Sequence, residues 1–150
     1  MQTAEMAQAL NRSGYLRAVA APKSLLVIED DMSLIQFLSS IVETRFPNLE
    51  WEYVTSGEEA LELIHRRARY RGGLPYNLVV SDVFLDGDVT GLDVWLDCKA
   101  DYPDMPFVIT SHLSTERYFS ILRESGQCPI YLPKPLTLLN CKSVLEEFLE

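Results

Sequence analysis

The chain has 150 residues, of which 47% are hydrophobic and 23% are charged. These proportions are typical of a soluble globular protein with one domain and one core. A formal net charge of -9 argues against direct binding to nucleic acid, and no apolar run reaches the roughly 18 residues of a membrane-spanning helix.

The cysteines indicate the redox compartment. Cys98, Cys128 and Cys141 are widely spaced and form no C-x-x-C pair, so they fit neither a disulfide framework nor a zinc site. We expect buried, reduced thiols. No basic segment followed by an apolar segment precedes residues 18–21, so a secretory signal is not indicated. The sequence therefore predicts a cytoplasmic protein.

The first 22 residues differ in pattern from the rest of the chain. They carry a weak helical pattern at residues 4–10, and Gly14 and Pro22 interrupt the segment. A regular alternation of apolar runs and helical patterns starts only at Lys23. We interpret residues 1–22 as an N-terminal extension and residues 23–150 as the domain.

Five short apolar runs, each bounded by turn residues, predict five β-strands. They cover residues 25–28, 51–55, 78–82, 106–111 and 130–132. The run at 51–55 alternates between apolar and polar residues, which is typical of an edge strand. The runs at 25–28, 78–82 and 106–111 are continuous, as in strands of a parallel sheet covered on both faces.

Apolar residues at helical spacing predict a helix after each strand. Asp31 can cap the first helix, residues 56–59 resemble a capping box before the second, and the third covers residues 92–100. Ser114 can cap the fourth, which ends at Gly126. The fifth places these apolar residues on one face: Leu138, Cys141, Val144, Leu145 and Phe148. The alternation predicts an α/β fold with a doubly wound parallel sheet and right-handed crossovers.

Polar residues occur at the carboxyl ends of four of the predicted strands. They are the Glu-Asp-Asp of residues 29–31, Asp82, Ser111 and Lys134. In a doubly wound sheet these ends meet at one edge. Four carboxylates held together repel one another, so the arrangement predicts a bound cation, and hard carboxylate oxygens suit Mg²⁺.

The remaining strand-end residues suit phosphoryl chemistry. Lys134 is a natural counter-charge to a phosphoryl group, and Ser111 can donate a hydrogen bond to its oxygens. An aspartate among such partners can act as a nucleophile and form an acyl phosphate. Asp82 is the candidate, because it ends the central apolar run.

With these motifs, residues 23–150 resemble a response-regulator receiver domain of two-component signal transduction. The resemblance implies a flavodoxin-like sheet of five strands in the order 2-1-3-4-5, with helices on both faces. Asp82 matches the phospho-accepting aspartate, and Lys134 matches the lysine of a Lys-Pro step whose peptide bond is usually cis. Ser111 and Tyr131 match the switch hydroxyl and the switch aromatic.

The resemblance also implies a ligand set for Mg²⁺. Asp30 and Asp82 would bind the ion directly, the backbone carbonyl of Phe84 would be a further ligand, and Glu29 would act through water. Asp31 is interpreted as a helix cap rather than a ligand. Once Asp82 is phosphorylated, the phosphoryl group would draw in Ser111 and Lys134, and Tyr131 would turn inward.

The implied function is a signalling switch rather than an enzyme with turnover. A sensor histidine kinase or a phosphotransfer protein would donate the phosphoryl group. The surface formed by the fourth helix, the fifth strand and the fifth helix of the domain would then change. That surface would contact an output protein, an effector domain or a second copy of the chain.

Three features depart from the family pattern. The loop between Asp82 and Gly91 is one residue longer than usual, which leaves Asp86 and Asp88 near the predicted metal. His112 replaces a small residue beside the phosphate and predicts altered phosphorylation or dephosphorylation kinetics. Phe84 and Leu113 flank the site and are apolar, so they cannot assist an attacking water, and we expect slow self-hydrolysis of the phosphoryl group.

Two other functions fit parts of the sequence. Residues 86–90 match the D-x-D-x-T pattern of haloacid-dehalogenase-type hydrolases, but only about 60 residues remain for that family's further motifs. A receiver fold can also serve as an interaction module without phosphorylation, an alternative that His112 and the long loop leave open. The basic residues around His65 are interpreted as a solvated helix face.

Overall fold

The computed structural model describes residues 22–122 and 128–150 of the chain. The predicted extension up to residue 21 and the predicted helix end at Gly126 lie outside the described residues. Within them, no helix combines the length and the apolar character needed to cross a membrane.

Five strands form one parallel sheet, and each lies within one residue of its predicted bounds. They are β1 (Ser24–Ile28), β2 (Glu50–Val54), β3 (Leu78–Asp82), β4 (Phe107–Ser111) and β5 (Ile130–Pro133). The order across the sheet is β2-β1-β3-β4-β5, which confirms the predicted order. All five residues of β1, β3 and β4 are buried, whereas β2 lies at an edge and is partly exposed.

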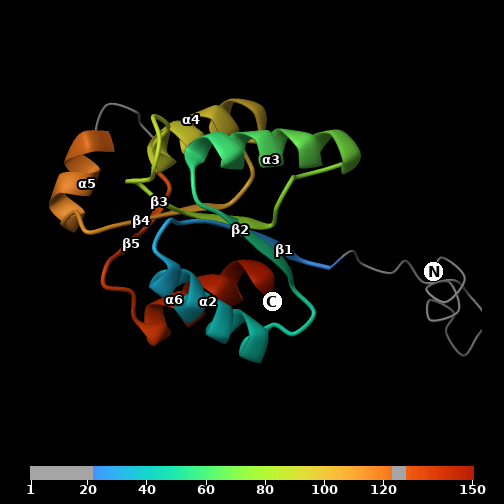
Figure 1. Ribbon diagram of the computed structural model, residues 1–150, viewed down its shortest axis with the longest axis horizontal. Coiled ribbons are helices and arrows are strands. Elements are labelled where there is room, and N and C mark those ends of the chain that lie inside the picture. The colour runs from blue at the N-terminus through green and yellow to red at the C-terminus, as the bar shows by residue number, and fades with distance from the viewer. Residues whose placement is uncertain (1–21, 123–127) are drawn as a thin grey trace, which may run out of the picture.

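Five helices of the described residues cover the two faces of the sheet. They are α2 (Met32–Arg45), α3 (Gly57–Tyr70), α4 (Gly91–Asp101), α5 (Thr115–Leu122) and α6 (Leu138–Leu149). Figure 1 shows α2 and α6 on one face of the sheet and α3 and α4 on the other. The core residue Tyr118 places α5 with α3 and α4.

The central strands separate two apolar cores. Leu26, Ile28, Val79 and Ile109 belong to the core under α3, α4 and α5. Their neighbours along the chain point to the opposite core, under α2 and α6: Leu25, Val27, Leu78, Val80 and Val108. Because both faces are covered, these strands are continuously apolar. Each such side chain contributes roughly 1.5–3 kcal/mol by its burial.

Side-chain caps start the helices close to the strand ends. The Asp31 carboxylate accepts a hydrogen bond from the Ser33 N–H at 2.9 Å, as predicted for a helix cap. Ser56 accepts from the Glu59 N–H, and Ser114 accepts from the Arg117 N–H. Each cap satisfies a donor that the first helical turn leaves unpaired. The caps fix where the chain leaves the carboxyl edge of the sheet.

Candidate functional site

Three carboxylates meet at the carboxyl edge of the sheet. Glu29 and Asp30 follow β1, and Asp82 is the last residue of the adjacent strand β3. One oxygen from each of the three lies within 4.8 Å of the others. Glu29 and Asp82 are buried, and Asp30 is half-buried.

Lys134 connects two of these carboxylates. Its Nζ donates to Glu29 Oε2 at 3.1 Å and to Asp82 Oδ2 at 2.9 Å. The lysine side chain is only 5% exposed, so both ion pairs are shielded from water. Removing one partner of such a buried pair is strongly destabilising, because it leaves an uncompensated charge.

The pKa values in this group shift for opposing reasons. Burial raises the pKa of Glu29, and the nearby Asp82 charge adds to the rise, while hydrogen bonds from the Asp31 N–H and from Lys134 oppose it. Burial acts to lower the pKa of Lys134, but its bonds to Asp82 and Glu29 outweigh burial and raise that pKa. The lysine therefore stays charged.

Glu29 also shapes the turn after β1. Its Oε1 accepts hydrogen bonds from the N–H groups of Asp30 and Asp31, both at 3.1 Å. The two bonds hold the turn in the conformation that brings Asp30 beside Asp82. Glu29 thus positions Asp30 and is itself a member of the acidic cluster.

The donor set fits a divalent cation. If all three carboxylates are ionised, Lys134 balances one negative charge and leaves two. Carboxylate oxygens are the ligands that Mg²⁺ and Mn²⁺ prefer, usually with water in the remaining positions. Glu29, Asp30 and Asp82 could therefore hold such an ion. Phe84 lies beside them, where its N–H is 3.4 Å from Asp82 Oδ1.

The backbone at Asp82 is held closely by the start of α4. The Gly91 N–H donates to the Val83 carbonyl at 2.9 Å. A Cβ at Gly91 would lie 2.0 Å from the Asp82 carbonyl oxygen, a distance no side chain can occupy. Only glycine allows α4 to begin this close to the strand end. The Ser81 hydroxyl also donates to the Asp82 carbonyl, at 2.9 Å.

Ser111 lies on the strand next to Asp82. Thr110 is the register partner of Asp82, so Ser111 is one residue further along β4, at the same edge of the sheet. The buried Ser111 hydroxyl accepts a hydrogen bond from the Leu113 N–H at 2.9 Å. The Lys134 N–H donates to the Ser111 carbonyl at 2.8 Å, which ties β4 to the lysine. The Lys134–Pro135 peptide bond is cis, as the resemblance implies.

Tyr131 contacts the loop that follows Ser111. Its hydroxyl donates to the Ser111 carbonyl at 3.1 Å and also to the Leu113 carbonyl. Its half-buried ring stacks on Tyr118 of α5, with ring centroids 3.9 Å apart and an interplanar angle of 10°. Tyr118 is itself fully buried and donates to the Pro129 carbonyl. The two rings thus link β5, α5 and the loop after β4.

Comparisons with known proteins identify the fold. No family model matches the chain. Its structure matches a phosphorylated cyanobacterial phytochrome response regulator, RcpA, with a TM-score of 0.70, 20% identity and coverage of 87% of this chain and 96% of that one. The chain has the fold of a response-regulator receiver domain.

Other solved structures have a similar fold. The Mn²⁺-bound response regulator Rcp1 matches with a TM-score of 0.70 and 20% identity, over 86% of this chain and 96% of that one. The N-terminal domain of an uncharacterised Wolinella succinogenes protein, WS1339, is 28% identical, with a TM-score of 0.65 over 85% of this chain and 94% of that one.

A curated sequence relative is the chemotaxis protein CheV2 of Helicobacter pylori. It is 27% identical over 105 residues, which are 67% of this chain. The same residues are 31% of the relative, so the chain spans about a third of that protein's length.

In this receiver fold the long loop after β3 is held by a residue that the sequence did not reveal. Glu58, in the first turn of α3, accepts hydrogen bonds from the N–H groups of Asp88 at 3.1 Å and Val89 at 2.7 Å. Gly87 has a φ of 89°, and a Cβ there would lie 2.4 Å from the Glu58 carboxylate. Nothing local indicates this contact, because it joins residues about thirty positions apart in the chain.

Asp86 and Asp88 do not join the acidic cluster among the described residues. Both are exposed, and Asp86 forms an isolated β-bridge with Ser56. The D-x-D-x-T pattern therefore lies in the loop, while Asp82 occupies the strand end.

Two predictions about side-chain exposure were wrong. Cys98 and Cys141 are buried, as expected, but Cys128 is exposed because it precedes the edge strand β5 rather than lying within a helix. His65 is not on a fully solvated face. Its side chain is 34% exposed and hydrogen-bonded to two residues of the neighbouring α4 end, Asp97 and Tyr102.

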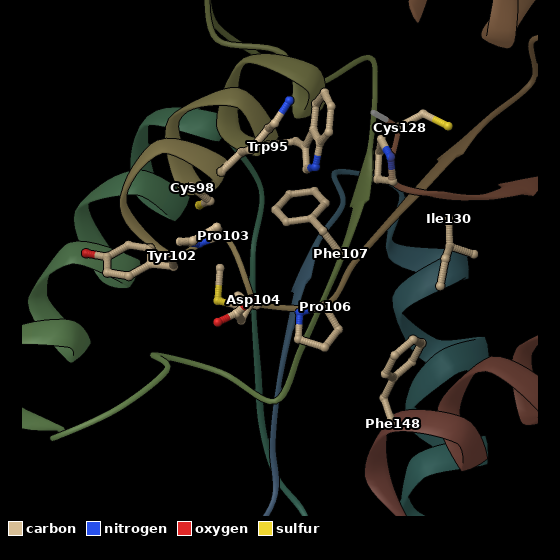
Figure 2. Close-up of a pocket in the computed structure, with 13 residues that line it drawn as sticks. Trp95, Cys98, Tyr102, Pro103, Asp104, Pro106, Phe107, Cys128, Ile130 and Phe148 are labelled. Atoms are coloured by element: carbon tan, nitrogen blue, oxygen red, sulfur yellow. The ribbon is translucent and has the colours of Figure 1, made fainter. Parts of the chain in front are cut away.

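One hollow lies away from the acidic cluster. Figure 2 shows it between α4, the start of β4 and the end of α6, with Trp95, Phe107, Ile130 and Phe148 around it. Its volume is about 410 Å³. Phe107 and Ile130 are the first residues of their strands, so the hollow opens at the amino edge of the sheet, opposite Asp82.

Proposed function

We propose that the chain is a phosphorylation-dependent signalling switch whose phosphoryl acceptor is Asp82. The observation that carries the proposal is the buried Asp82 carboxylate, held at 2.9 Å by the buried Lys134 ammonium beside Glu29 and Asp30. A nucleophilic carboxylate, a fixed positive charge and two further acids are the groups that formation of an acyl phosphate requires.

The chemical step is a transfer between two nucleophiles. An Asp82 carboxylate oxygen attacks the phosphorus of a phosphohistidine, and the new P–O bond forms as the P–N bond breaks. The imidazole leaves with the electron pair of that bond and takes up a proton from water. Lys134 would then face both the new acyl phosphate and Glu29, and the Ser111 hydroxyl would donate to a phosphoryl oxygen.

Mg²⁺ is the cofactor that we propose. Asp30, Asp82 and the backbone carbonyl of Phe84 would hold the ion directly, and Glu29 would act through water. When bound, the ion supplies positive charge to the phosphoryl oxygens. The Mn²⁺-bound Rcp1 and the phosphorylated RcpA, which share the fold, support this proposal by the states in which they were crystallised.

The output surface would be the face formed by α5, β5 and α6. Tyr131 connects that face to the site, because its hydroxyl bonds involve Ser111 and Leu113. Exposed apolar side chains occur on these three elements: Phe119, Ile121, Ile130, Leu138 and Leu139. We infer that the surface contacts an output protein or a second copy of the chain, after transfer from a cytoplasmic histidine kinase or phosphotransfer protein.

The test is phosphorylation by a small donor. The chain is incubated with Mg²⁺ and acetyl phosphate, and its intact mass is followed over time. We expect one phosphoryl adduct that disappears when EDTA replaces Mg²⁺ and when Asp82 is changed to Asn. Asp86→Asn is the matched control. It removes an exposed carboxylate from the loop that follows Asp82 and should leave the adduct in place.

Two results would contradict the proposal. One is an adduct that persists in Asp82→Asn, which would move the acceptor elsewhere. The other is no adduct in the unaltered chain although Mg²⁺ binds to it. The latter result would favour an interaction module that works without phosphorylation, and His112→Ala would then show whether that side chain blocks access.

A further inference from the structure

A second group of potential metal ligands lies between α3 and α4, the two helices that share one face of the sheet. His65 comes from α3, and Asp97 and Asp101 come from the last turns of α4. The two aspartates are four residues apart, which places them on one face of the helix. One ligand atom from each of the three residues lies within 4.8 Å of the others.

The imidazole of His65 is oriented by both of its nitrogens. Nδ1 lies 3.0 Å from the Tyr102 hydroxyl, and Nε2 lies 2.8 Å from Asp97 Oδ2. Figure 2 shows the Tyr102 hydroxyl directed away from the hollow. Histidines that bind metals usually donate their second N–H to an oxygen of this kind, which fixes the ring and its tautomer. Tyr102 thus leaves Nε2 facing the carboxylates.

The two carboxylates of this cluster favour a cation, and the charge of Arg69 in α3, which reaches Tyr102, opposes it in part. Asp97 and Asp101 lie at the carboxyl end of α4, where the helix dipole is negative and repels carboxylates. Within residues 22–122 and 128–150, Asp101 forms no ion pair that would offset this repulsion. Lys99, the basic residue of the same turn, lies instead over the Trp95 ring.

Access to the cluster is open. The side chains of His65 and Asp97 are 34% and 44% exposed, so an ion can enter and keep bound water. The cluster is also separate from Asp82, since Gly91 at the first turn of α4 contacts Asp82 while Asp97 and Asp101 lie at the other end of the helix. An α-helix rises about 9 Å over the six residues from Gly91 to Asp97 and about 15 Å over the ten residues from Gly91 to Asp101.

We propose that His65, Asp97 and Asp101 form a second divalent-metal site, with Tyr102 as a positioning residue. One imidazole nitrogen and two carboxylate oxygens suit Zn²⁺ and its transition-metal neighbours better than Mg²⁺, which prefers oxygen ligands. The ion would replace the hydrogen bond between His65 and Asp97, and water would complete its coordination. The site clamps α3 to α4 and does not depend on phosphorylation of Asp82.

The test uses the fact that the chain has two histidines, His65 and His112. Zn²⁺ is titrated into the full chain labelled with ¹⁵N-histidine, in excess Mg²⁺ to occupy the acidic cluster at Asp82. We expect one Zn²⁺ per chain, with a shift of the His65 Nε2 resonance and none for His112, which follows β4 at the carboxyl edge of the sheet and is not a member of the cluster.

Variants separate ligands from neighbours. We expect His65→Gln to abolish saturable binding and Asp101→Asn to weaken it at least about tenfold, the minimum effect typical even of residues that only support a ligand. Tyr102→Phe should weaken binding by about the same factor and leave the shift at Nε2. Asp104→Asn is the matched control, because it removes an exposed charge outside the cluster and should leave the affinity within about twofold.

The proposal is overturned by either of two results. One is Zn²⁺ binding that shifts only His112, which would place the ion near Asp82. The other is an affinity that is equal in the unaltered chain and in Asp101→Asn, whose exposed side chain can be changed without disturbing the core. In both cases the His65–Asp97 contact is only a hydrogen bond between two helices.

Discussion

Asp82 differs from the other aspartates of the chain in its surroundings. Asp86 and Asp88 follow it closely in sequence but are exposed, whereas Asp82 is buried against Lys134. Removing one partner of a buried ion pair commonly costs about 3–5 kcal/mol, because a charge is left without its counter-charge. A phosphoryl group on Asp82 would keep the negative charge that Lys134 requires.

The cysteines allow a test of burial at single residues. Burial raises the pKa of Cys98 to about 12, with contributions from the charges of Asp97 and Asp101, and raises the pKa of Cys141 to about 11. The thiolate is the reactive form, so a raised pKa makes both thiols unreactive below those values. At pH 8 we expect iodoacetamide to add once, at the exposed Cys128, and three times in urea.

The control for this labelling is Cys128→Ser, which should give no adduct in the folded state. Labelling of Cys141 should increase as the pH approaches about 11, and labelling of Cys98 only nearer about 12. Intact mass spectrometry counts the adducts. Two or three adducts on the folded chain at pH 8 would contradict the burial of these thiols.

Strand ends explain which residues of the site could be predicted from the sequence. The carboxyl ends of parallel strands meet at one edge, so the sequence alone predicts that Asp30, Asp82 and Lys134 lie close together. The sequence could not indicate that Lys134 bridges Asp82 and Glu29, or that Tyr131 stacks on Tyr118, since both depend on side-chain packing.

At the level of elements, the loops after β2 and β3 behave as one unit. Glu58 accepts two backbone hydrogen bonds from the β3–α4 loop, and Ser56 forms a β-bridge with Asp86. A Cβ at Gly57 would lie 2.6 Å from the Val89 side chain, so the two loops are in close contact. This contact explains how the loop after β3 is held in place.

Changing Glu58 should therefore loosen the loop that carries the site. In Glu58→Ala the N–H groups of Asp88 and Val89 lose their acceptor, and we expect their hydrogen exchange to become faster. The lost bonds should lower the free energy of unfolding by about 1 kcal/mol. Phosphorylation by acetyl phosphate should also be slower, because the Phe84 backbone at the start of this loop is then less fixed.

Two variants make this experiment specific. Glu58→Gln keeps a side-chain oxygen that can accept both bonds, so exchange should remain close to that of the unaltered chain. Glu59→Ala removes a carboxylate from the same helical turn without touching the loop, and it controls for the helix dipole. Unchanged protection of Asp88 and Val89 in Glu58→Ala would show that the loop holds itself.

The start of α4 shows which local features can be predicted from the sequence. Thr90 and Asp93 form a full capping box at the start of α4, and their spacing in the sequence carries that signal, although the apolar pattern predicts a start one residue later. The Glu58 contact had no such signal. Local patterns predict where an element begins, but a contact between two loops requires the fold.

At the scale of the whole molecule, the two edges of the sheet have different roles. The carboxyl edge gathers the charged residues around Asp82, and the amino edge opens into the hollow beside Phe107. The α5, β5 and α6 face lies between them and contacts the charged edge through Tyr131. If Asp82 accepts a phosphoryl group as proposed, Tyr131 would link that change to the outer face.

The balance of charge at the carboxyl edge leads to a prediction about global stability. Three carboxylates and one lysine lie together, so a bound divalent cation relieves repulsion that the folded state alone contains. A ligand that binds only the folded state at 100 times its dissociation constant stabilises it by about 2.7 kcal/mol. We expect Mg²⁺ to raise the urea midpoint of the chain accordingly.

The variant Asp30→Asn should distinguish stabilisation by Mg²⁺ bound at the acidic cluster from a general effect of salt. Without Mg²⁺, the variant should be more stable than the unaltered chain, because one of the repelling charges is gone. With Mg²⁺, it should gain little, since a ligand of the ion has been lost. Asp86→Asn, which changes an exposed carboxylate outside the cluster, should gain as much as the unaltered chain. Equal gains for the unaltered chain and Asp30→Asn would mean that Mg²⁺ binds elsewhere, and the acidic cluster would then be stabilised by Lys134 alone.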